Sequence, residues 1–133
     1  MSDPRAIQVL LVEDNVGDIM LIHQSLAGEH IPVSLHIAVD GEQAVELLSD
    51  HFHPDLIILD LNIPKVSGLS VLERCHPEVP VVVFTSSSRP HDHLRAMDLG
   101  AKDYVQKSTD IAEYMEQVRA IIRNWGILAV MQT

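Results

Sequence analysis

Residues 56–68 read LIILDLNIPKVSG, and this stretch decides the fold. The four successive apolar residues Leu56–Leu59 are typical of a central parallel strand that is covered on both faces. Asp60 ends the apolar run, and Pro64 and Gly68 then indicate a loop before a short helix begins. The stretch therefore predicts a buried strand whose carboxyl end presents an aspartate.

Similar apolar runs recur along the chain, and each ends at a polar residue or a turn. Further strands are predicted at Ile7–Val12, Ser34–Val39, Val79–Phe84 and Tyr104–Gln106. Between the strands, apolar residues recur at helical spacing, and helix-starting residues precede them. Five strands alternating with five helices predict a doubly wound parallel sheet in a flavodoxin-like α/β fold.

Each predicted helix is expected to bury one apolar stripe. The predicted inward residues are Ile19, Ile22 and Leu26; Ala44, Val45 and Leu48; Leu69 and Leu72; Leu94 and Met97; and Met115, Val118, Ile122 and Trp125. Asp14 or Asn15 is expected to cap the first helix, and Asp110 with Glu113 forms an N-terminal box on the last. Gly126 is expected to end or bend that last helix.

The polar residues at the strand ends form the candidate site. In an open parallel sheet, ligands bind outside the carboxyl ends of the strands. Those ends carry Glu13, Asp14, Asp60, Thr85 and Lys107. Three carboxylates, a hydroxyl and an ammonium group at one edge predict a site for a divalent cation and a phosphoryl group.

Composition narrows the class of protein. The 133 residues suit one domain with a real core, and an apolar content of 47% is ordinary for a globular protein. A net charge of −10 argues against binding to nucleic acid or anionic membranes. The chain shows no secretory signal and no apolar run near the ~20 residues of a membrane span. Because Cys75 is the single cysteine, we expect a cytoplasmic protein without an internal disulfide.

The chain resembles the receiver domain of bacterial response regulators, the phosphorylated part of two-component signalling, over residues 7–124. The resemblance implies strand order 2-1-3-4-5, a requirement for Mg²⁺ and phosphorylation by a sensor histidine kinase. Asp60 matches the phosphoacceptor of the family, and Lys107 matches its lysine. Thr85 matches the switch hydroxyl and Tyr104 the switch aromatic residue. Such a domain catalyses only its own phosphorylation and dephosphorylation, so it would not be an enzyme in the usual sense.

The adjacent acids Glu13 and Asp14 match the acidic pair of the family. A hard Mg²⁺ ion takes one or two carboxylates, several waters and a phosphoryl oxygen. We expect Asp14 and Asp60 to be direct ligands of this ion. The backbone carbonyl of Asn62 would be a third ligand, and Glu13 would act through a water. Lys107 would neutralise charge on the phosphoryl oxygens.

Two sequence details refine the resemblance. Ser108 follows Lys107, where the family has a proline after a cis peptide bond. A cis bond without proline costs ~2.5–4 kcal/mol, so this bond is either trans or strained. The stretches LVEDNVGD and DLNIPK are most similar to single-domain regulators that partner with phytochrome-type kinases.

Other interpretations stay open at this point. A receiver-like interaction module that is never phosphorylated would share the fold. An aspartyl-phosphate phosphatase of the haloacid dehalogenase type would use a similar nucleophile, but its motif needs an acid where Asn62 stands. A flavodoxin needs a phosphate loop after the first strand, and a P-loop GTPase needs G-x-x-x-x-G-K, which is absent. The pairs His51-x-His53 and His91-x-His93 lack further metal ligands nearby, so we expect surface residues.

The chain is expected to divide into a receiver domain, residues 1–126, and a short apolar tail, residues 127–133, with no output domain. The tail either completes the core or contacts a partner, and we favour contact because an exposed apolar patch suggests an interface. We therefore expect a homodimer through the tail and the face of the fourth helix, fifth strand and fifth helix. Thr85 and Tyr104 would couple phosphorylation to this face.

Overall fold

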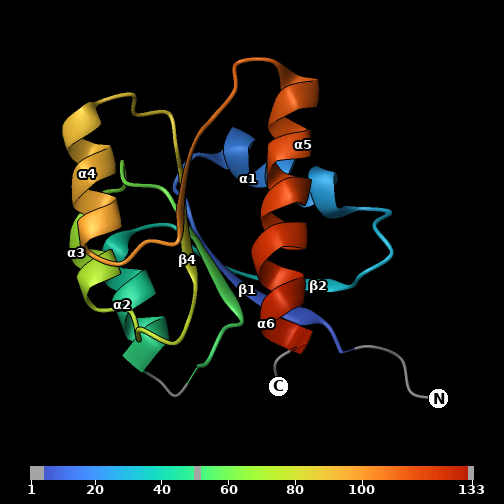
Figure 1. Ribbon diagram of the computed structural model, residues 1–133, viewed down its shortest axis with the longest axis horizontal. Coiled ribbons are helices and arrows are strands. Elements are labelled where there is room, and N and C mark those ends of the chain that lie inside the picture. Colours follow the sequence, from blue (N-terminus) through green and yellow to red (C-terminus); the bar gives the residue numbers. More distant parts are fainter. Residues whose placement is uncertain (1–4, 50–51, 132–133) are drawn as a thin grey trace.

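A central parallel sheet lies between two layers of helices in the computed structural model, which describes residues 5–49 and 52–131 (Figure 1). The strands are β1 (Ile7–Val12), β2 (Val33–Ala38), β3 (Leu56–Leu59), β4 (Val81–Thr85) and β5 (Asp103–Gln106). Their order in the sheet is β2-β1-β3-β4-β5, and every pair is parallel. The predicted fold class and strand order are confirmed. The strand bounds differ from the prediction by up to two residues.

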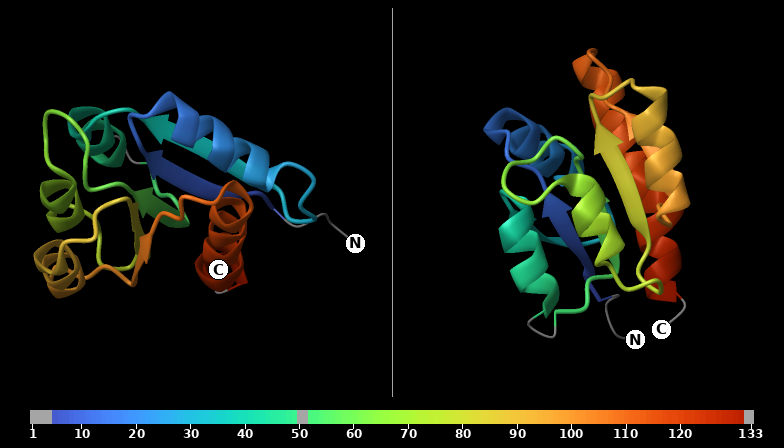
Figure 2. Two further views of the ribbon diagram at one scale, coloured as in Figure 1. Left: turned by 90° about the horizontal axis from the view of Figure 1, so that it is seen from above. Right: turned by 90° about the vertical axis from the view of Figure 1, so that its left-hand side faces the viewer.

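The helices are α1 (Val16–Leu26), α2 (Gly41–Ser49), α3 (Gly68–Glu73), α4 (Pro90–Asp98), α5 (Ile111–Ile121), the π-helical turn η1 (Ile122–Gly126) and α6 (Ile127–Met131). Helices α1, α5 and α6 cover one face of the sheet, and α2, α3 and α4 cover the other (Figures 1 and 2). Each strand leads into a helix and returns parallel, so all five strands end at the same edge.

The register of the central strands places the candidate site. All four residues of β3 are buried, as the apolar run predicts. β1 pairs with β3 from Val9 opposite Leu56 to Val12 opposite Leu59. Both strands therefore end level, and the Asp60 amide donates a hydrogen bond to the Val12 carbonyl at 3.0 Å. The residues that follow β1 and β3 must lie side by side.

Helix α4 corrects one prediction about the core. Leu94 and Met97 are 72% and 41% exposed, so they do not face inward as expected. The buried residue of this helix is Ala96, and Leu99 just beyond it is partly buried. The apolar residues near this helix form two possible stripes, one with Leu94 and Met97 and one with Ala96 and Leu99. The stripe with the small alanine lets the helix approach the sheet closely, and that stripe faces the sheet.

The end of the chain corrects a second prediction. Gly126 does not end the helix, because α5 continues through the π-helical turn η1 into α6; a bend at Gly126 stays a prediction. Gly126 is buried, and a Cβ atom there would lie 3.3 Å from Ile7 Cγ2. The glycine therefore permits close approach to β1. Ile127 and Val130 pack against the same core cluster, so the described part of the tail helps to complete the core.

The predicted caps of the first and last helices are confirmed, and the buried stripe of the last helix is displaced by one residue. Asn15 caps α1 by accepting from the Asp18 amide at 2.9 Å. Asp110 caps α5 by accepting from the Glu113 amide at 2.9 Å. The buried face of α5 and η1 consists of Tyr114, Val118, Ile121 and Ile122, with Trp125 partly buried beside them. Met115 is only partly buried, because the stripe is centred one residue earlier than predicted.

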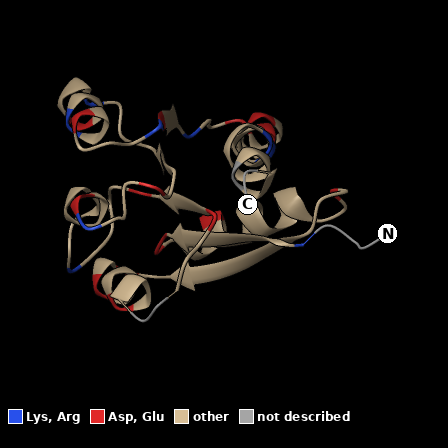
Figure 3. Ribbon diagram, turned by 60° about the horizontal axis from the view of Figure 1, so that its bottom comes forward, with Lys and Arg blue, Asp and Glu red and all other residues tan. Residues whose placement is uncertain are grey.

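The basic residues are distributed over several elements of the fold. The Lys and Arg positions drawn in Figure 3 lie on several different elements and do not gather on one face. Among the described residues, no helix combines the length and the apolar character that crossing a lipid bilayer requires.

Candidate functional site

Three carboxylates meet where β1 and β3 end. Glu13, Asp14 and Asp60 can each offer one oxygen such that all three oxygens lie within 4.8 Å of one another. Glu13 and Asp60 are buried, whereas Asp14 is exposed to solvent. No other group of three or more possible metal-ligating side chains occurs among the described residues. The predicted acids therefore do come together at one sheet edge.

Lys107 reaches this acidic cluster from the segment after β5. Its Nζ atom lies 2.6 Å from Glu13 Oε1 and 3.1 Å from Asp60 Oδ2. The lysine side chain is only 8% exposed. The Lys107 amide donates to the Thr85 carbonyl at 2.8 Å, which holds the segment against β4. The peptide bond between Lys107 and Ser108 is trans, so the lysine is placed here without a cis bond.

Burial and pairing shape the charges of this cluster. Burial raises the pKa of Glu13 to about 7, although the hydrogen bond from Lys107 opposes the rise. Burial also works to lower the pKa of Lys107, but the hydrogen bond to Glu13 and the nearby Asp60 outweigh it and leave that pKa raised. Lys107 therefore stays charged, and together with the Asn15 amide it favours the ionised form of Glu13.

Hydrogen-bond donors surround the Asp60 carboxylate and the Thr85 hydroxyl. The Asn62 amide donates to Asp60 Oδ1 at 3.0 Å. The Asn62 side chain contacts Thr85 Oγ1 at 3.5 Å, and the Ser87 amide donates to the same hydroxyl at 3.3 Å. Thr85 is fully buried at the end of β4. The segments after β3 and β4 are thus linked across the site.

Tyr104 lies on β5, one step further from the carboxylates. Its hydroxyl donates to the Ser87 carbonyl at 3.2 Å. Its ring stacks on His93 of α4, with 4.6 Å between ring centroids and 18° between the planes. Because Ser87 also contacts Thr85, the tyrosine is connected to the site through the segment after β4.

Sequence reasoning missed Asp18, which also faces this site. Asp18 Oδ2 lies 3.4 Å from Lys107 Nζ, and Asp18 Oδ1 accepts from the Tyr114 hydroxyl at 2.5 Å. The available signal was its place in the chain, because Asp18 lies in the first turn of α1, just after the segment that follows β1.

Two glycines allow the segment after Asp60 to pack closely. A Cβ atom at Gly41 would lie 2.0 Å from the Val66 carbonyl oxygen, and one at Gly68 would lie 2.5 Å from Leu61 Cα. Within this segment Lys65 has a positive φ of 70°, and its ammonium group lies 3.5 Å from Asp40 Oδ2. The packing fixes the backbone that follows Asp60.

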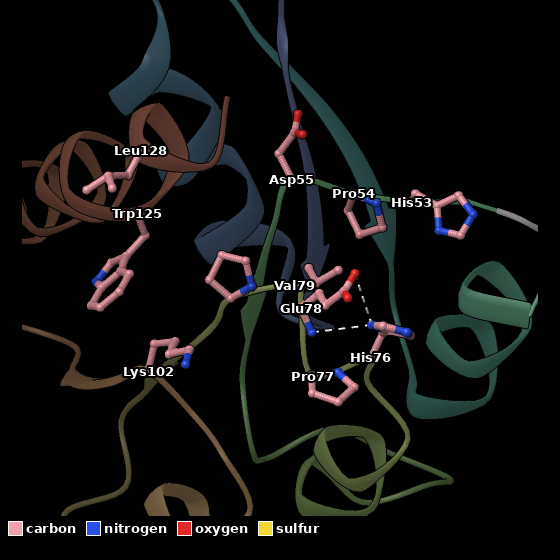
Figure 4. Close-up of a pocket in the computed structure, with 11 residues that line it drawn as sticks. His53, Pro54, Asp55, His76, Pro77, Glu78, Val79, Lys102, Trp125 and Leu128 are labelled. Atoms are coloured by element: carbon pink, nitrogen blue, oxygen red, sulfur yellow. Dashed lines mark hydrogen bonds and ion pairs between the residues drawn. The ribbon is translucent and has the colours of Figure 1, made fainter. Parts of the chain in front are cut away.

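A separate open groove of about 800 Å³ lies at the opposite edge of the sheet (Figure 4). Its lining residues precede β3, β4 and β5 or belong to the last helical segment; they include His53, His76, Lys102, Trp125 and Leu128. None of the carboxylates of the site lines this groove, so the groove is not part of the candidate site.

The histidine pairs take no part in a metal-ligand cluster among the described residues. His51 lies outside the described residues, and His53 lines the groove just described. His91 is exposed, and His93 is exposed while its ring stacks on Tyr104.

Comparison with known proteins identifies the family. The family model of the response regulator receiver domain matches residues 9–119. The chain belongs to the response regulator receiver family. The response regulator ArlR of Staphylococcus aureus is 32% identical over 118 residues, which cover 87% of this chain and 52% of ArlR. The receiver thus spans about half the length of that relative.

Solved structures agree with this assignment. The phosphorylated cyanobacterial phytochrome response regulator RcpA superposes with a TM-score of 0.85 at 33% identity, covering 91% of this receiver and 94% of RcpA. The Mn²⁺-bound response regulator Rcp1 gives a TM-score of 0.83 at 32% identity, covering 90% and 94%. The predicted likeness to single-domain, phytochrome-associated regulators is therefore confirmed. Receivers of this family are generally non-catalytic modules that accept phosphoryl groups in two-component signalling.

Proposed function

We propose that Asp60 accepts a phosphoryl group from the phosphohistidine of a sensor histidine kinase. The observation that carries this proposal is the buried Asp60 carboxylate, which lies 3.1 Å from the Lys107 ammonium group and beside two further acids. An oxygen of Asp60 attacks phosphorus, and the new P–O bond forms as the P–N bond breaks. The imidazole leaves with the electron pair of that bond and takes its proton from solvent.

The surrounding groups suit the charge of the transferred phosphoryl group. Lys107 can bind a phosphoryl oxygen and neutralise its negative charge, because the ammonium group already contacts the Asp60 carboxylate. The Asn62 amide, which now donates to Asp60 Oδ1, lies where it can donate to the transferred group. Thr85, buried at the end of β4, offers a hydroxyl that contacts the Asn62 side chain at 3.5 Å.

The acidic cluster has the chemistry that a magnesium ion needs. Its oxygens lie within 4.8 Å of one another and are all hard donors. Asp14 and Asp60 would hold Mg²⁺ directly, the Asn62 carbonyl would be a third ligand, and Glu13 would act through a water. When bound, the ion would neutralise charge on the phosphoryl oxygens. The structure of Rcp1 with Mn²⁺ supports a divalent ion in this family.

Signal output is proposed to pass through altered protein contact or onward phosphotransfer. The connection from Thr85 through Ser87 leads from the site to Tyr104 on β5 and, through the stacking of Tyr104 on His93, to α4. Leu94 and Met97 on the outer side of α4 are exposed apolar residues suited to a partner. We propose a phytochrome-type kinase as the phosphoryl donor, supported by the likeness to RcpA, and the cytoplasm as the compartment.

A homodimer through this face and the tail remains a proposal. Leu128 and Met131 are 51% and 78% exposed, while Ile127 and Val130 of the same helix pack on the core. Replacing Leu128 and Met131 with serine should therefore reduce the mass in light scattering from dimer to monomer and leave the fold intact. A wild-type protein that is monomeric at high micromolar concentration would rule out this dimer.

The main proposal is tested by incubating the protein with acetyl phosphate and Mg²⁺ and measuring its intact mass. A working receiver gains one labile phosphoryl adduct, and a chelator prevents it. An interaction module that is never phosphorylated gains none. An aspartyl-phosphate phosphatase would instead release phosphate continuously from simple phosphate esters. The absence of an adduct in the wild-type protein would contradict the proposed function.

A further inference from the structure

The Lys107 ammonium group contacts a carboxylate that the proposed phosphoryl transfer does not use. Asp18 Oδ2 lies 3.4 Å from Lys107 Nζ, compared with 2.6 Å for Glu13 and 3.1 Å for Asp60. The lysine is only 8% exposed and the Asp18 side chain 22% exposed, so water screens this contact incompletely. One positive charge is thus shared among three carboxylates.

Asp18 is held firmly in this place. Its amide donates to the Asn15 cap at 2.9 Å in the first turn of α1. Its other carboxylate oxygen accepts a 2.5 Å hydrogen bond from the Tyr114 hydroxyl of α5. The Tyr114 ring is buried and packs on Phe84, with 5.0 Å between centroids. Asp18 therefore cannot simply follow the lysine when the lysine moves.

Lys107 and Tyr114 compete for the charge of this carboxylate. The tyrosine hydroxyl donates to one oxygen, and the lysine approaches the other. A short hydrogen bond from Tyr114 withdraws part of the carboxylate charge from the lysine. Without that bond, the full charge of Asp18 would face Lys107.

We propose that Asp18 is a positioning residue that limits how far Lys107 turns toward the phosphoryl group, and that Tyr114 moderates this restraint. The proposal rests on the proposed function of Asp60 as phosphoacceptor. In labelling by acetyl phosphate, an Asp60 oxygen bonds to phosphorus as the P–O bond to acetate breaks, and acetate leaves with the electron pair. Lys107 must then bind phosphoryl oxygens, and Asp18 restrains it from doing so.

Two variants should change the labelling rate in opposite directions. Asp18→Asn keeps an oxygen that can accept from Tyr114 but removes the charge, so labelling should be faster by about three- to tenfold. Tyr114→Phe leaves the carboxylate charge wholly to Lys107, so labelling should be slower by about two- to threefold. The double variant should behave like Asp18→Asn, because Tyr114 acts only through that charge.

The labelling rate is measured by intact mass with acetyl phosphate and Mg²⁺. Asp98→Asn is the matched control, because it removes one exposed carboxylate at the end of α4. A second measurement follows the ammonium resonance of Lys107 by NMR in the metal-free protein. That resonance should move in Asp18→Asn and in Tyr114→Phe, and stay in place in the control. Thermal unfolding checks that each variant is folded.

The outcomes separate this inference from the proposed function. Absence of any adduct on the wild-type protein would overturn the proposed function and this inference with it. A labelled wild-type protein whose Asp18→Asn variant reacts no faster would overturn the inference alone. Slower reaction of both single variants would show that Asp18 and Tyr114 have a purely structural role. An unmoved Lys107 resonance in folded Asp18→Asn would overturn the inference as well.

Discussion

Lys107 lies closer to Glu13 than to Asp60: its ammonium group is 2.6 Å from the Glu13 carboxylate and 3.1 Å from that of Asp60. The two partners of the shorter contact are 94 positions apart in the sequence. Both side chains are buried, so this contact joins the end of β1 to the segment after β5 with little screening by water.

Removing the ammonium group should destabilise the metal-free protein in a pH-dependent manner. Burial has raised the Glu13 pKa from 4.5 to about 7, so the folded state favours a protonated Glu13. The contribution of Glu13 to the free energy of unfolding is fully present below the pKa of Glu13 in the unfolded chain. It declines as the pH rises through the pKa of Glu13 in the folded protein, about 7. Lys107→Gln should therefore cost about 3 kcal/mol near pH 8 and clearly less near pH 5.

Urea unfolding in the presence of a chelator measures this difference. The control Lys102→Gln removes an ammonium group at the opposite edge of the sheet, where it lines the open groove. Its cost should be small at both pH values. An equal loss for Lys107→Gln at both pH values would contradict the charge dependence between Lys107 and Glu13.

Asp14→Asn should weaken Mg²⁺ binding by about tenfold or more, because the proposed direct ligand loses its charge. Isothermal calorimetry is the suitable measurement. The fluorescence of Trp125 is not, because this residue lines the groove at the far edge of the sheet. Asp98→Asn again provides the control of equal charge. Unchanged magnesium affinity in Asp14→Asn would remove this residue from the ligand set.

Gly41→Ala should destabilise the fold by about 3 kcal/mol, because the new methyl group would lie 2.0 Å from the Val66 carbonyl oxygen. Backbone atoms cannot yield cheaply, so the segment after Asp60 would shift and labelling by acetyl phosphate would slow. Gly100→Ala is the contrasting variant, with open space but a positive φ of 103°. It should cost about 1 kcal/mol through backbone strain and leave labelling unchanged. Equal losses in urea unfolding would contradict the packing argument.

Phosphorylation should move the connection between Thr85 and Tyr104. In the structure, the Tyr104 hydroxyl donates to the Ser87 carbonyl and its ring stacks on His93. A phosphoryl group should draw the Thr85 hydroxyl inward, which opens space for Tyr104 to leave these contacts and turn toward the core. A crystal structure with beryllofluoride and Mg²⁺ would show this movement. Thr85 and Tyr104 in unchanged positions would contradict it.

The fold could be predicted from the sequence because its strands are marked by continuous apolar runs. Leu56–Leu59 is buried at every position, and the polar residue after it lies at the predicted edge. The weaker predictions concern helices with more than one apolar stripe. Leu94 and Met97 have the right spacing, yet Ala96 faces the sheet because a small residue permits closer packing. The apolar pattern of the sequence does not tell which of two stripes on a helix packs better against the sheet.

The proximity of Glu13, Asp14, Asp60 and Lys107 could be predicted from the sequence, because the ends of parallel strands converge at one edge of the sheet. Asp18 was missed, since the prediction considered only residues that directly follow strands. A glycine in this position indicates the end or a bend of a helix, but the contact of Gly126 with Ile7 depends on tertiary packing. Such long-range contacts leave no local signal in the sequence.

The most direct test of the account is to find which residue carries the phosphoryl group. After labelling with acetyl phosphate and Mg²⁺, borohydride reduces an aspartyl phosphate to homoserine, which peptide mass spectrometry locates. We predict homoserine at position 60 alone, and none in Asp60→Asn. Homoserine at Asp14, or labelling that persists in Asp60→Asn, would contradict the assignment of Asp60 as the phosphoacceptor.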